Sequence, residues 1–351
     1  MNYLFISLVS ILILFFLQSK YSSFILPKES IQENDRKIHS QEVSRFGGIS
    51  ILPLIFILNS VNDQNIINLL YFGLIIFLIG FVEDVMNGIP AIIRFILLSA
   101  IVTYFLLDSN FIIYDFNHLY LNTILTSSNF VLYLFFILGF LFMINGFNFI
   151  DGNNGLMLGF SLFVLITYSI VIYHQNDINS DLFILCCGTI VALSSLFIFN
   201  IFTGKILSGD SGSYFLGFII GGVSILMAKY NFLNSLTVAC IIFYPVMEIV
   251  FTFIRRLLIL RVSPFKPDNK HLHMLLYQLL LKKFSNNKKT INFNLINSLT
   301  SLIILLIIAF TYLFIFLVLR NTNEVIILIV LALFYIIAHI SLEKSLKTTN
   351  S

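Results

Sequence analysis

Long apolar segments alternate with short polar ones along the chain. Each apolar segment is close to the roughly 17–25 residues that an α-helix needs to cross the hydrocarbon core of a bilayer. The pattern predicts about eleven transmembrane helices, at residues 3–18, 46–60, 66–83, 90–107, 130–148, 155–173, 182–202, 212–228, 235–258, 293–319 and 324–342. The second segment is short, and Pro53 leaves its ends undefined.

The composition excludes a soluble fold. Hydrophobic residues make up 58% of the 351 residues and charged residues 11%, whereas soluble domains have about 45–50% and about 25%. We predict an all-α integral membrane protein, with residues 1–351 in a single polytopic bundle. Its motif-bearing core spans about 45–275, followed by an amphipathic cytoplasmic segment at 276–292 and two C-terminal helices at 293–342.

Basic residues set the predicted orientation. Of the 20 Lys and Arg residues, all except Lys229 and Arg320 fall in the loops after odd-numbered helices or in the C-terminal segment. Because basic residues concentrate on the cytoplasmic side of a membrane, we expect the N-terminus outside and the C-terminus inside. The first apolar segment lacks a preceding basic region, so we expect it to stay as a helix and not to be cleaved as a signal peptide.

Polar segments on the predicted cytoplasmic side contain the groups that bind metal ions and phosphates. They are residues 44–48 (SRFGG), 81–94 (FVEDVMNGIPAIIR), 145–156 (NGFNFIDGNNGL), 208–217 (SGDSGSYFLG) and 255–275 (RRLLILRVSPFKPDNKHLHML). Since all of them face one side of the membrane, they can build a single site.

An acidic pair, Glu83 and Asp84, ends the predicted helix at 66–83. Neighbouring side chains on a helix point about 100° apart, so one carboxylate can face the bundle while the other faces the loop. The pair can bind Mg²⁺ or act as a base. The alternative is a helix-end pair that nearby basic residues neutralise.

Amides and carboxylates recur in the next two segments. Asn145, Asn148 and Asp151 follow one another every three residues, which keeps neighbouring members close on one side of a helix. Their oxygens are hard ligands that suit Mg²⁺, and an interhelical hydrogen-bond cluster is the alternative. Asp210 precedes an apolar helix, where it can be a simple cap or can mark a phosphate-binding helix N-terminus.

The last cytoplasmic segment is rich in cationic side chains. They are Arg255, Arg256, Arg261, Lys266, Lys270, His271 and His273. Two prolines within the segment, Pro264 and Pro267, prevent one continuous helix. Topology accounts for part of the positive charge but not for the His-x-His. Metal ligands together with phosphate-binding cations suit phosphoryl transfer, where positioning and charge neutralisation carry most of the catalysis.

Five motifs in order carry a family resemblance: RFGG, the acidic pair, NGFNFIDGNNGL, GDSGS and SPFKPDNKHLHMLL. The chain resembles the polyprenyl-phosphate N-acetylhexosamine-1-phosphate transferases, the family of bacterial MraY and WecA and of the eukaryotic GlcNAc-1-phosphate transferase of N-glycosylation. The SPFKPD…HLH segment, and the lack of a longer glycine-rich motif before the second helix, are more similar to the O-antigen and enterobacterial-antigen branch than to the peptidoglycan branch.

The resemblance implies a reaction. A UDP-N-acetylhexosamine would give its sugar 1-phosphate to undecaprenyl phosphate at the cytoplasmic face of the bacterial inner membrane, releasing UMP. The lipid-linked product would initiate a cell-surface polysaccharide of the O-antigen type. The implied cofactor is Mg²⁺, with Mn²⁺ as the alternative ion. The implied partners are the two substrates and the bilayer, with no nucleic acid, and a homodimer is the one protein assembly considered.

The resemblance also assigns roles to residues. The catalytic residues are Glu83, Asp84, Asp151, His271 and His273, the metal ligands Asn148 and Asp210, and the substrate-binding residues Arg45, Gly47, Gly48, Arg94, Asn145, Asn154 and Lys270. Asp84 would act on or orient the lipid phosphate, and Asn154 would contact uracil. The two histidines would hold the diphosphate or the sugar.

The chain departs from the family pattern at several positions. Glu83 stands where Asp is usual, and Met274 stands where bacterial relatives often have His. Asn154 replaces the second Asp of the family's DGxDG pattern, a position where the eukaryotic members also use Asn. Glu248 stands where relatives often carry Asp, in a helix that also contains Pro245, and we expect its side chain to face the protein interior.

A transporter or flippase of an anionic lipid or nucleotide-sugar is the rival hypothesis. Transporters place functional charges near the bilayer midplane, on broken helices. Here Glu248 is the single ionisable residue expected near mid-span, and the other charges gather at the cytoplasmic ends of the helices. That distribution favours an enzyme acting at the membrane interface.

Overall fold

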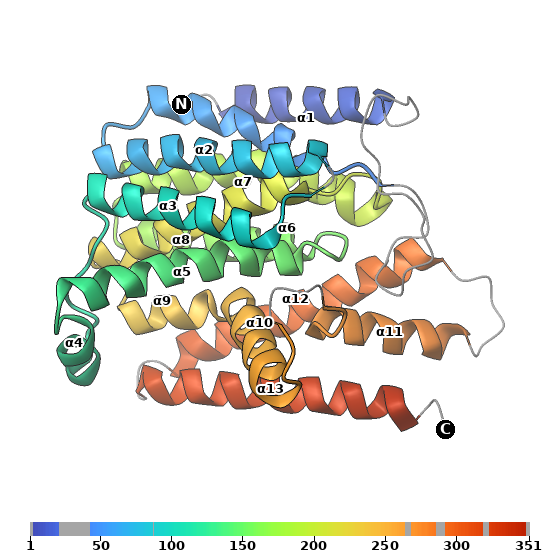
Figure 1. The fold of residues 1–351 in the computed structure, drawn as a ribbon. Helices are drawn as coiled ribbons and strands as arrows, with labels where there is room; N and C mark the ends of the chain where they lie inside the picture. Colours follow the sequence, from blue (N-terminus) through green and yellow to red (C-terminus); the bar gives the residue numbers. More distant parts are fainter. Residues whose placement is uncertain are drawn as a thin grey trace.

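The computed structural model describes residues 3–20, 43–86, 88–263, 268–285, 292–318 and 323–348, and in these ranges the chain is built from helices (Figure 1). The helices are α1 (Tyr3–Lys20), η1 (Gly47–Asn59), α2 (Gln64–Met86), α3 (Ala91–Asp108), α4 (Leu119–Leu125), α5 (Asn129–Ile150), α6 (Leu156–His174), α7 (Asp181–Thr203), α8 (Gly209–Lys229), α9 (Ser235–Ile241), α10 (Phe243–Ile254), η2 (Arg255–Ile259), α11 (Leu272–Ser285), α12 (Phe293–Val318) and α13 (Glu324–Thr348). The predicted all-α membrane fold is confirmed.

Within the described residues, eight helices are long and apolar enough to cross a membrane: α2, α3, α5, α6, α7, α8, α12 and α13. The predicted segments 3–18 and 46–60 coincide with shorter apolar helices, so the number eleven stays a prediction. The second of these, η1, is a 3₁₀-helix of 13 residues that contains Pro53. A 3₁₀-helix rises about 2.0 Å per residue, so η1 is about 26 Å long, well above the length of an α-helix of the same size.

The expectation of one continuous helix over 235–258 is wrong. The chain breaks between α9 and α10, and the two parts are bent by 75°. Pro245 supplies the reason, because proline has no N–H to donate to the carbonyl four residues earlier, which belongs to Ile241. That carbonyl accepts a hydrogen bond from the Tyr312 hydroxyl of α12 instead, at 2.6 Å.

Helix α8 is the centre of the bundle. Its apolar window is 89% buried, compared with 22% for α3 and for α13. It packs against α2 and α5 at glycines, where small side chains let helices approach closely. A Cβ added at Gly80 of α2 would lie 2.5 Å from the Asp210 carbonyl, and one at Gly217 of α8 would lie 2.7 Å from the Met143 carbonyl of α5. The N-terminus of α8 is thereby held against the end of α2.

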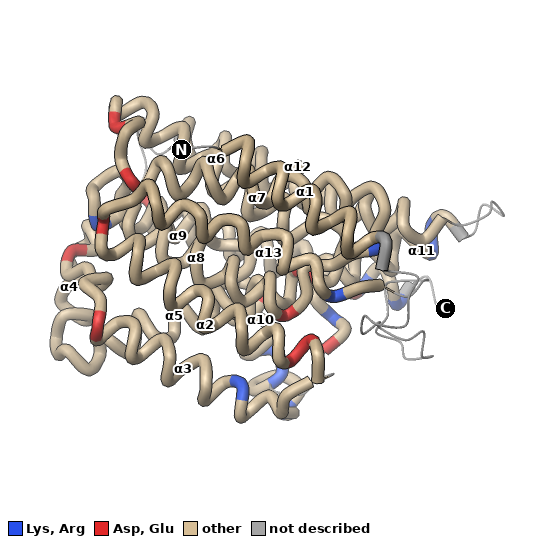
Figure 2. Tube along the Cα trace, turned by 90° about the horizontal axis from the view of Figure 1, so that it is seen from above, with Lys and Arg blue, Asp and Glu red and all other residues tan. Residues whose placement is uncertain are grey.

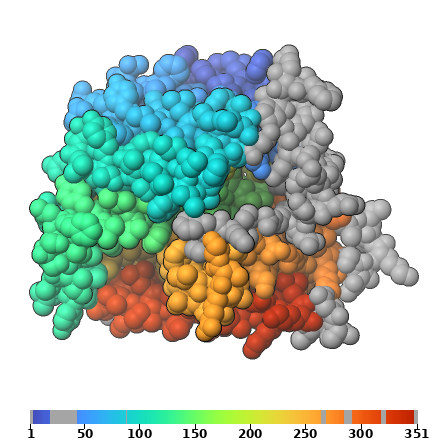
Figure 3. Space-filling view, viewed as in Figure 1, coloured from blue at the N-terminus to red at the C-terminus, as the bar shows by residue number. Residues whose placement is uncertain are grey.

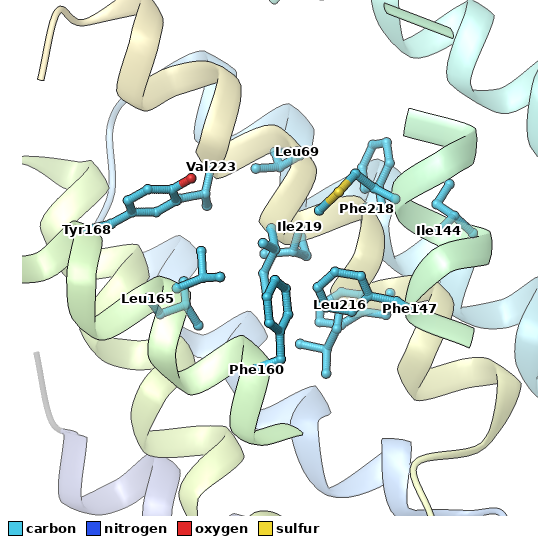
Figure 4. Packing of buried hydrophobic residues seen from close by; sticks show 14 of the residues in the cluster. Leu69, Ile144, Phe147, Phe160, Leu165, Tyr168, Leu216, Phe218, Ile219 and Val223 are labelled. Carbon is cyan, nitrogen blue, oxygen red and sulfur yellow. The ribbon is translucent and has the colours of Figure 1, made fainter. Parts of the chain in front are cut away.

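Side chains from four helices fill the core around α8 (Figure 4). They include Leu69 of α2, Ile144 and Phe147 of α5, Phe160, Leu165 and Tyr168 of α6, and Leu216, Phe218, Ile219 and Val223 of α8. This apolar packing fixes α8 along its length, so the polar residues at its start have a defined position.

The basic residues gather at one end of the bundle (Figure 2). The opposite end carries mainly acidic residues, with Lys229 as its basic residue among those described. The structure therefore has the charge asymmetry on which the predicted orientation rests. Which end faces the cytoplasm stays a prediction.

Candidate active site

The carboxylate of Asp84 caps helix α8 from the neighbouring helix α2. Its Oδ1 accepts the backbone N–H of Asp210 at 2.9 Å, and its Oδ2 accepts that of Ser211 at 3.0 Å. Asp84 is 1% exposed. A carboxylate at a helix N-terminus satisfies amide groups that have no intrahelical partner and favourably meets the positive end of the helix dipole. Asp84 therefore positions Asp210 at the start of α8.

The side chain of Asp210 meets the amide of Asn148 from helix α5. Asn148 Nδ2 donates to Asp210 Oδ1 at 2.5 Å and to the Ser213 hydroxyl at 3.2 Å. The two residues predicted as metal ligands are thus in direct contact. For both to bind one cation through oxygen, the Asn148 amide would have to turn and present its Oδ1, because its Nδ2 now faces Asp210.

Asp151 follows the last residue of α5 and adds a third carboxylate. It lies beside the Gly209 amide at the start of α8, and burial together with the charges of Asp210 and Asp84 raises the pKa of Asp151 well above its ordinary value. Arg45 lies close enough for its positive charge to act on both Asp84 and Asp210. The cluster gathers more negative charge than this cation balances, which is the setting that a bound cation stabilises.

The donor set suits a hard cation that is completed by substrate. No group of three or more His, Cys, Asp or Glu side chains among the described residues is arranged to hold a metal ion by itself. One or two carboxylates with an amide oxygen fit Mg²⁺, which keeps several waters and takes substrate phosphates as ligands. The residues present therefore fit the implied ion only as part of a complex with a phosphorylated substrate.

Backbone hydrogen bonds hold the RFGG motif (residues 45–48) beside the start of α8. Ser44 pairs with the stretch before α8, and Gly47 and Gly48 donate to the carbonyls of Leu207 and Ser208, each at 2.9 Å. A Cβ added at Gly48 would lie 2.6 Å from the Gly212 nitrogen. The two glycines are therefore needed for this close approach, and they place the intervening chain with Arg45 beside α8.

Glu83 has a different environment from its neighbour Asp84. Its Oε1 lies 2.6 Å from Nη1 of Arg94, and its Oε2 accepts the Tyr214 hydroxyl at 3.0 Å. The guanidinium of Arg94 also lies 5.8 Å from the centre of the Tyr214 ring. Glu83 is therefore a buried, neutralised carboxylate, and its longer side chain reaches the Arg94 of α3. The catalytic role of Glu83 and the substrate role of Arg94 stay predictions.

The His-x-His segment is anchored by Glu248. This carboxylate is fully buried, which confirms its predicted inward orientation, and its Oε2 lies 3.2 Å from Nδ1 of His271. Its Oε1 accepts the Leu272 amide at 3.2 Å. The rings of His271 and His273 are parallel, 5.6 Å apart, and His271 lies 4.7 Å from Phe149 of the NGFNFIDG motif. The histidines therefore reach the end of α5.

Burial lowers the pKa of His273 to about 4, so this ring is neutral at pH 7. Both of its nitrogens lack a hydrogen-bond partner within the described part of the chain. The surface of the molecule is hollowed beside the α2–α3 pair (Figure 3).

Some predicted site residues are engaged elsewhere. Asn145 donates to a carbonyl of its own helix. Asn154 is fully buried, and its backbone amide donates to Asn297 of α12 at 2.9 Å. Lys270 Nζ pairs with Glu343 of α13 at 2.9 Å. Their substrate contacts stay predictions, and Lys266 with both prolines of the last loop lies outside the described residues.

Sequence reasoning missed several participants. Ser213 and Tyr214 lie in the quoted SGDSGSY segment, yet nothing in their spacing indicated contacts with Asn148 and Glu83. His339 of α13, which contacts the Lys270 carbonyl, lies in the last apolar segment. An ionisable residue within an apolar span was the available signal, because such residues are rare and are usually paired.

The structure is a helical membrane bundle with a partly buried carboxylate–amide cluster at the start of α8, which defines a class of multi-span membrane protein with an interfacial polar site. The pattern of the family described as Glycosyl transferase family 4 matches residues 66–228, which include the acidic pair, the amide motif and Asp210. The chain belongs to this family.

Similar proteins have related names. The chain is 28% identical over 264 residues to the undecaprenyl-phosphate alpha-N-acetylglucosaminyl 1-phosphate transferase of Thermotoga maritima, covering 75% of this chain and 78% of that protein. It is 32% identical over 224 residues to the phospho-N-acetylmuramoyl-pentapeptide-transferase of Staphylococcus saprophyticus, covering 57% and 67%. It is 27% identical over 250 residues to a probable undecaprenyl-phosphate N-acetylglucosaminyl 1-phosphate transferase of Bacillus subtilis, covering 69% and 68%.

Proposed function

We propose that this protein transfers an N-acetylhexosamine 1-phosphate from a UDP-sugar to undecaprenyl phosphate, releasing UMP, on the cytoplasmic face of a bacterial cell membrane. The observation that carries the proposal is the cluster of Asp84, Asn148, Asp151 and Asp210 around the start of α8. The names of the similar proteins mention undecaprenyl phosphate and an N-acetylglucosaminyl 1-phosphate group, which supports the proposed acceptor and the proposed transferred group. The product would begin the assembly of a cell-surface polysaccharide of the O-antigen type.

The reaction exchanges one phosphoanhydride bond for another. An oxygen of the lipid phosphate attacks the β-phosphorus of the UDP-sugar and forms a new P–O bond. The bond from that phosphorus to the bridging oxygen breaks, and the oxygen leaves with the electron pair as part of UMP. Little covalent chemistry is required of the protein, so positioning and charge stabilisation dominate.

Each residue of the cluster has a separate role in positioning or charge stabilisation. Asp84 holds the first turn of α8 and so fixes Asp210. Asp210 with Asn148, and with Asp151 beside them, would hold Mg²⁺, with Mn²⁺ as the alternative. When bound, the ion supplies positive charge to the reacting phosphates. Arg45 lies at the same corner and adds a cation from the first loop.

The histidine segment forms the other side of the proposed site. Glu248 fixes the orientation of His271, whose ring lies near the end of α5. The nitrogens of His273 make no hydrogen bond within the described residues, and Nδ1 lies 3.9 Å from Glu248 Oε1; a ligand would reach this buried ring only after the loop moves. Together the two rings suit the diphosphate or the sugar of the nucleotide substrate.

A UMP-release assay tests the proposal. Purified protein is incubated with undecaprenyl phosphate and, one at a time, UDP-linked GlcNAc, GalNAc, QuiNAc and FucNAc, with Mg²⁺ or with a chelator. We expect UMP from at least one sugar, only when lipid phosphate and Mg²⁺ are both present. If no sugar yields UMP and the protein moves lipid or nucleotide across a vesicle membrane, the transferase proposal is wrong and the transporter hypothesis is favoured.

A further inference from the structure

The C-terminal helix α13 reaches the loop that carries the histidines. His339 Nε2 lies 2.7 Å from the backbone carbonyl of Lys270, the residue immediately before His271. One turn further along α13, Glu343 Oε1 accepts from Lys270 Nζ at 2.9 Å. Both residues of α13 lie outside residues 66–228, which match the family pattern.

The contact from His339 is buried and preorganised. His339 is 1% exposed, and its ring packs 4.7 Å from the ring of Phe251 on α10. Because a buried polar ring nitrogen needs a partner, the Lys270 carbonyl satisfies it, with the proton on Nε2. A bond to a backbone carbonyl does not depend on which side chain occupies position 270. It fixes the chain itself, directly beside His271.

Two neighbouring helices therefore hold the histidine loop at consecutive residues. Glu248 of α10 binds the His271 ring and the Leu272 amide, while His339 of α13 binds the carbonyl of Lys270. The helix α11 that follows the loop packs against both α12 and α13. The bent segment itself is braced by Tyr312 of α12 at the break before α10. The C-terminal helices thus support every element that carries the histidines.

We propose that His339 is a positioning residue that places His271 and His273 for the nucleotide-sugar. The proposal rests on the proposed function, because its kinetic test uses the same substrates. Loss of the hydrogen bond would release the chain at Lys270 while Glu248 still holds the His271 ring. The rings would then be correctly placed in a smaller fraction of molecules, so binding of the UDP-sugar would weaken more than the chemical step.

A matched pair of variants isolates the hydrogen bond. His339→Phe keeps an aromatic ring against Phe251 but removes the N–H, and His339→Gln restores an N–H at a similar reach. With the UDP-sugar that supports the greatest UMP release, we expect His339→Phe to raise its KM roughly five- to tenfold, the factor expected for one buried hydrogen bond. We expect His339→Gln to stay within about twofold of wild type on the same physical basis. The KM for undecaprenyl phosphate should not change in either variant.

Hydrogen exchange provides a readout that does not depend on activity. In the detergent-solubilised protein without substrate, amides in residues 268–275 should exchange faster in His339→Phe than in wild type or His339→Gln. If His339→Phe does not fold, His339→Leu replaces it, because leucine also packs against Phe251 without an N–H and should raise the same KM.

Unchanged exchange with an unchanged KM for the UDP-sugar would overturn the positioning role. Equal losses in kcat and in both KM values, together with a lower melting temperature, would also overturn it and leave a purely structural role. If wild type releases no UMP, the proposed function fails, and the exchange measurement alone decides whether α13 holds the loop.

Discussion

Replacing Asp84 with asparagine should lower both the stability of the fold and the rate of turnover. In the structure both oxygens of this carboxylate accept backbone N–H groups, from Asp210 and from Ser211. Asparagine has one acceptor oxygen, so its Nδ2 would point a donor at one of these amides. One N–H at the start of α8 would lose its partner in a buried site, and the negative charge at the helix N-terminus would be removed.

The size of the effect follows from these two losses. A hydrogen bond to a charged group contributes about 1.5–3 kcal/mol, and a charge at a helix terminus contributes about 0.3–1 kcal/mol. The expected loss in the free energy of unfolding is therefore about 2–4 kcal/mol. The entropy of unfolding is about 2.1 cal/mol/K per residue, which for 351 residues gives about 1.4 °C for each kcal/mol, so the melting temperature should fall by about 3–5 °C.

Thermal unfolding and UMP release should be measured on the same preparations. Asp108→Asn is the matched control, because Asp108 is an exposed carboxylate at the end of α3, away from the cluster. We expect Asp84→Asn to lower turnover by at least about a hundredfold, since loss of a preorganised charge in an active site has effects of this size. The control should keep both turnover and melting temperature.

Two outcomes would refute the reasoning in different ways. If Asp84→Asn loses turnover while its melting temperature equals that of wild type, the cap contributes nothing and Asp84 acts on the substrate directly. If Asp84→Asn keeps wild-type turnover, the assignment of the site to the start of α8 is wrong.

The remaining predictions concern the same corner of the molecule. Asp210→Asn should lose turnover by a similar factor with little change in melting temperature, because its side chain accepts only from Asn148 among the hydrogen bonds described; wild-type UMP release would contradict this. Gly80→Ala should lower the free energy of unfolding by about 1–3 kcal/mol through overpacking. Gly139→Ala is the control, because its added Cβ would meet nothing within 4 Å, and it should leave stability unchanged. Equal melting temperatures for the two variants would contradict this prediction. Because the folded state raises the pKa of Asp151, its ionisation destabilises the fold, and stability in chelator should fall as pH rises from about 4 through that pKa. Asp151→Asn should reduce this fall, and thermal melting at pH 5 and pH 8 shows whether it does.

The sequence was informative about the helices because span length is imposed by the bilayer. The apolar segment around 182–202 matches α7, and the one around 130–148 matches α5, within a few residues. The break at Ile242 was not predicted, since a single Pro245 is tolerated in many membrane helices. The bend is stable here because the Tyr312 hydroxyl, from a distant part of the chain, donates a hydrogen bond to the Ile241 carbonyl that Pro245 leaves free.

The membership of the site was easier to predict than its contacts. Five polar segments on one side indicated that Asp84, Asn148 and Asp210 would come together, and Asn148 and Asp210 do touch. That Asp84 would cap α8, and that Glu83 would instead pair with Arg94, depends on how two helices cross at Gly80. A helix crossing leaves no periodic trace in one sequence, so these contacts required the structure.

The cap on α8 also sets when the site can exist during synthesis. Asp84 and Asp210 are 126 residues apart in the chain, with α3 to α7 between them. While those helices are being inserted, the carboxylate of Asp84 does not yet have the α8 amides as hydrogen-bond donors. Insertion of α8 satisfies it in a single step. A chain truncated before Gly209 would lack the amides that Asp84 accepts, so the carboxylate–amide cluster would assemble only in chains that have inserted α8.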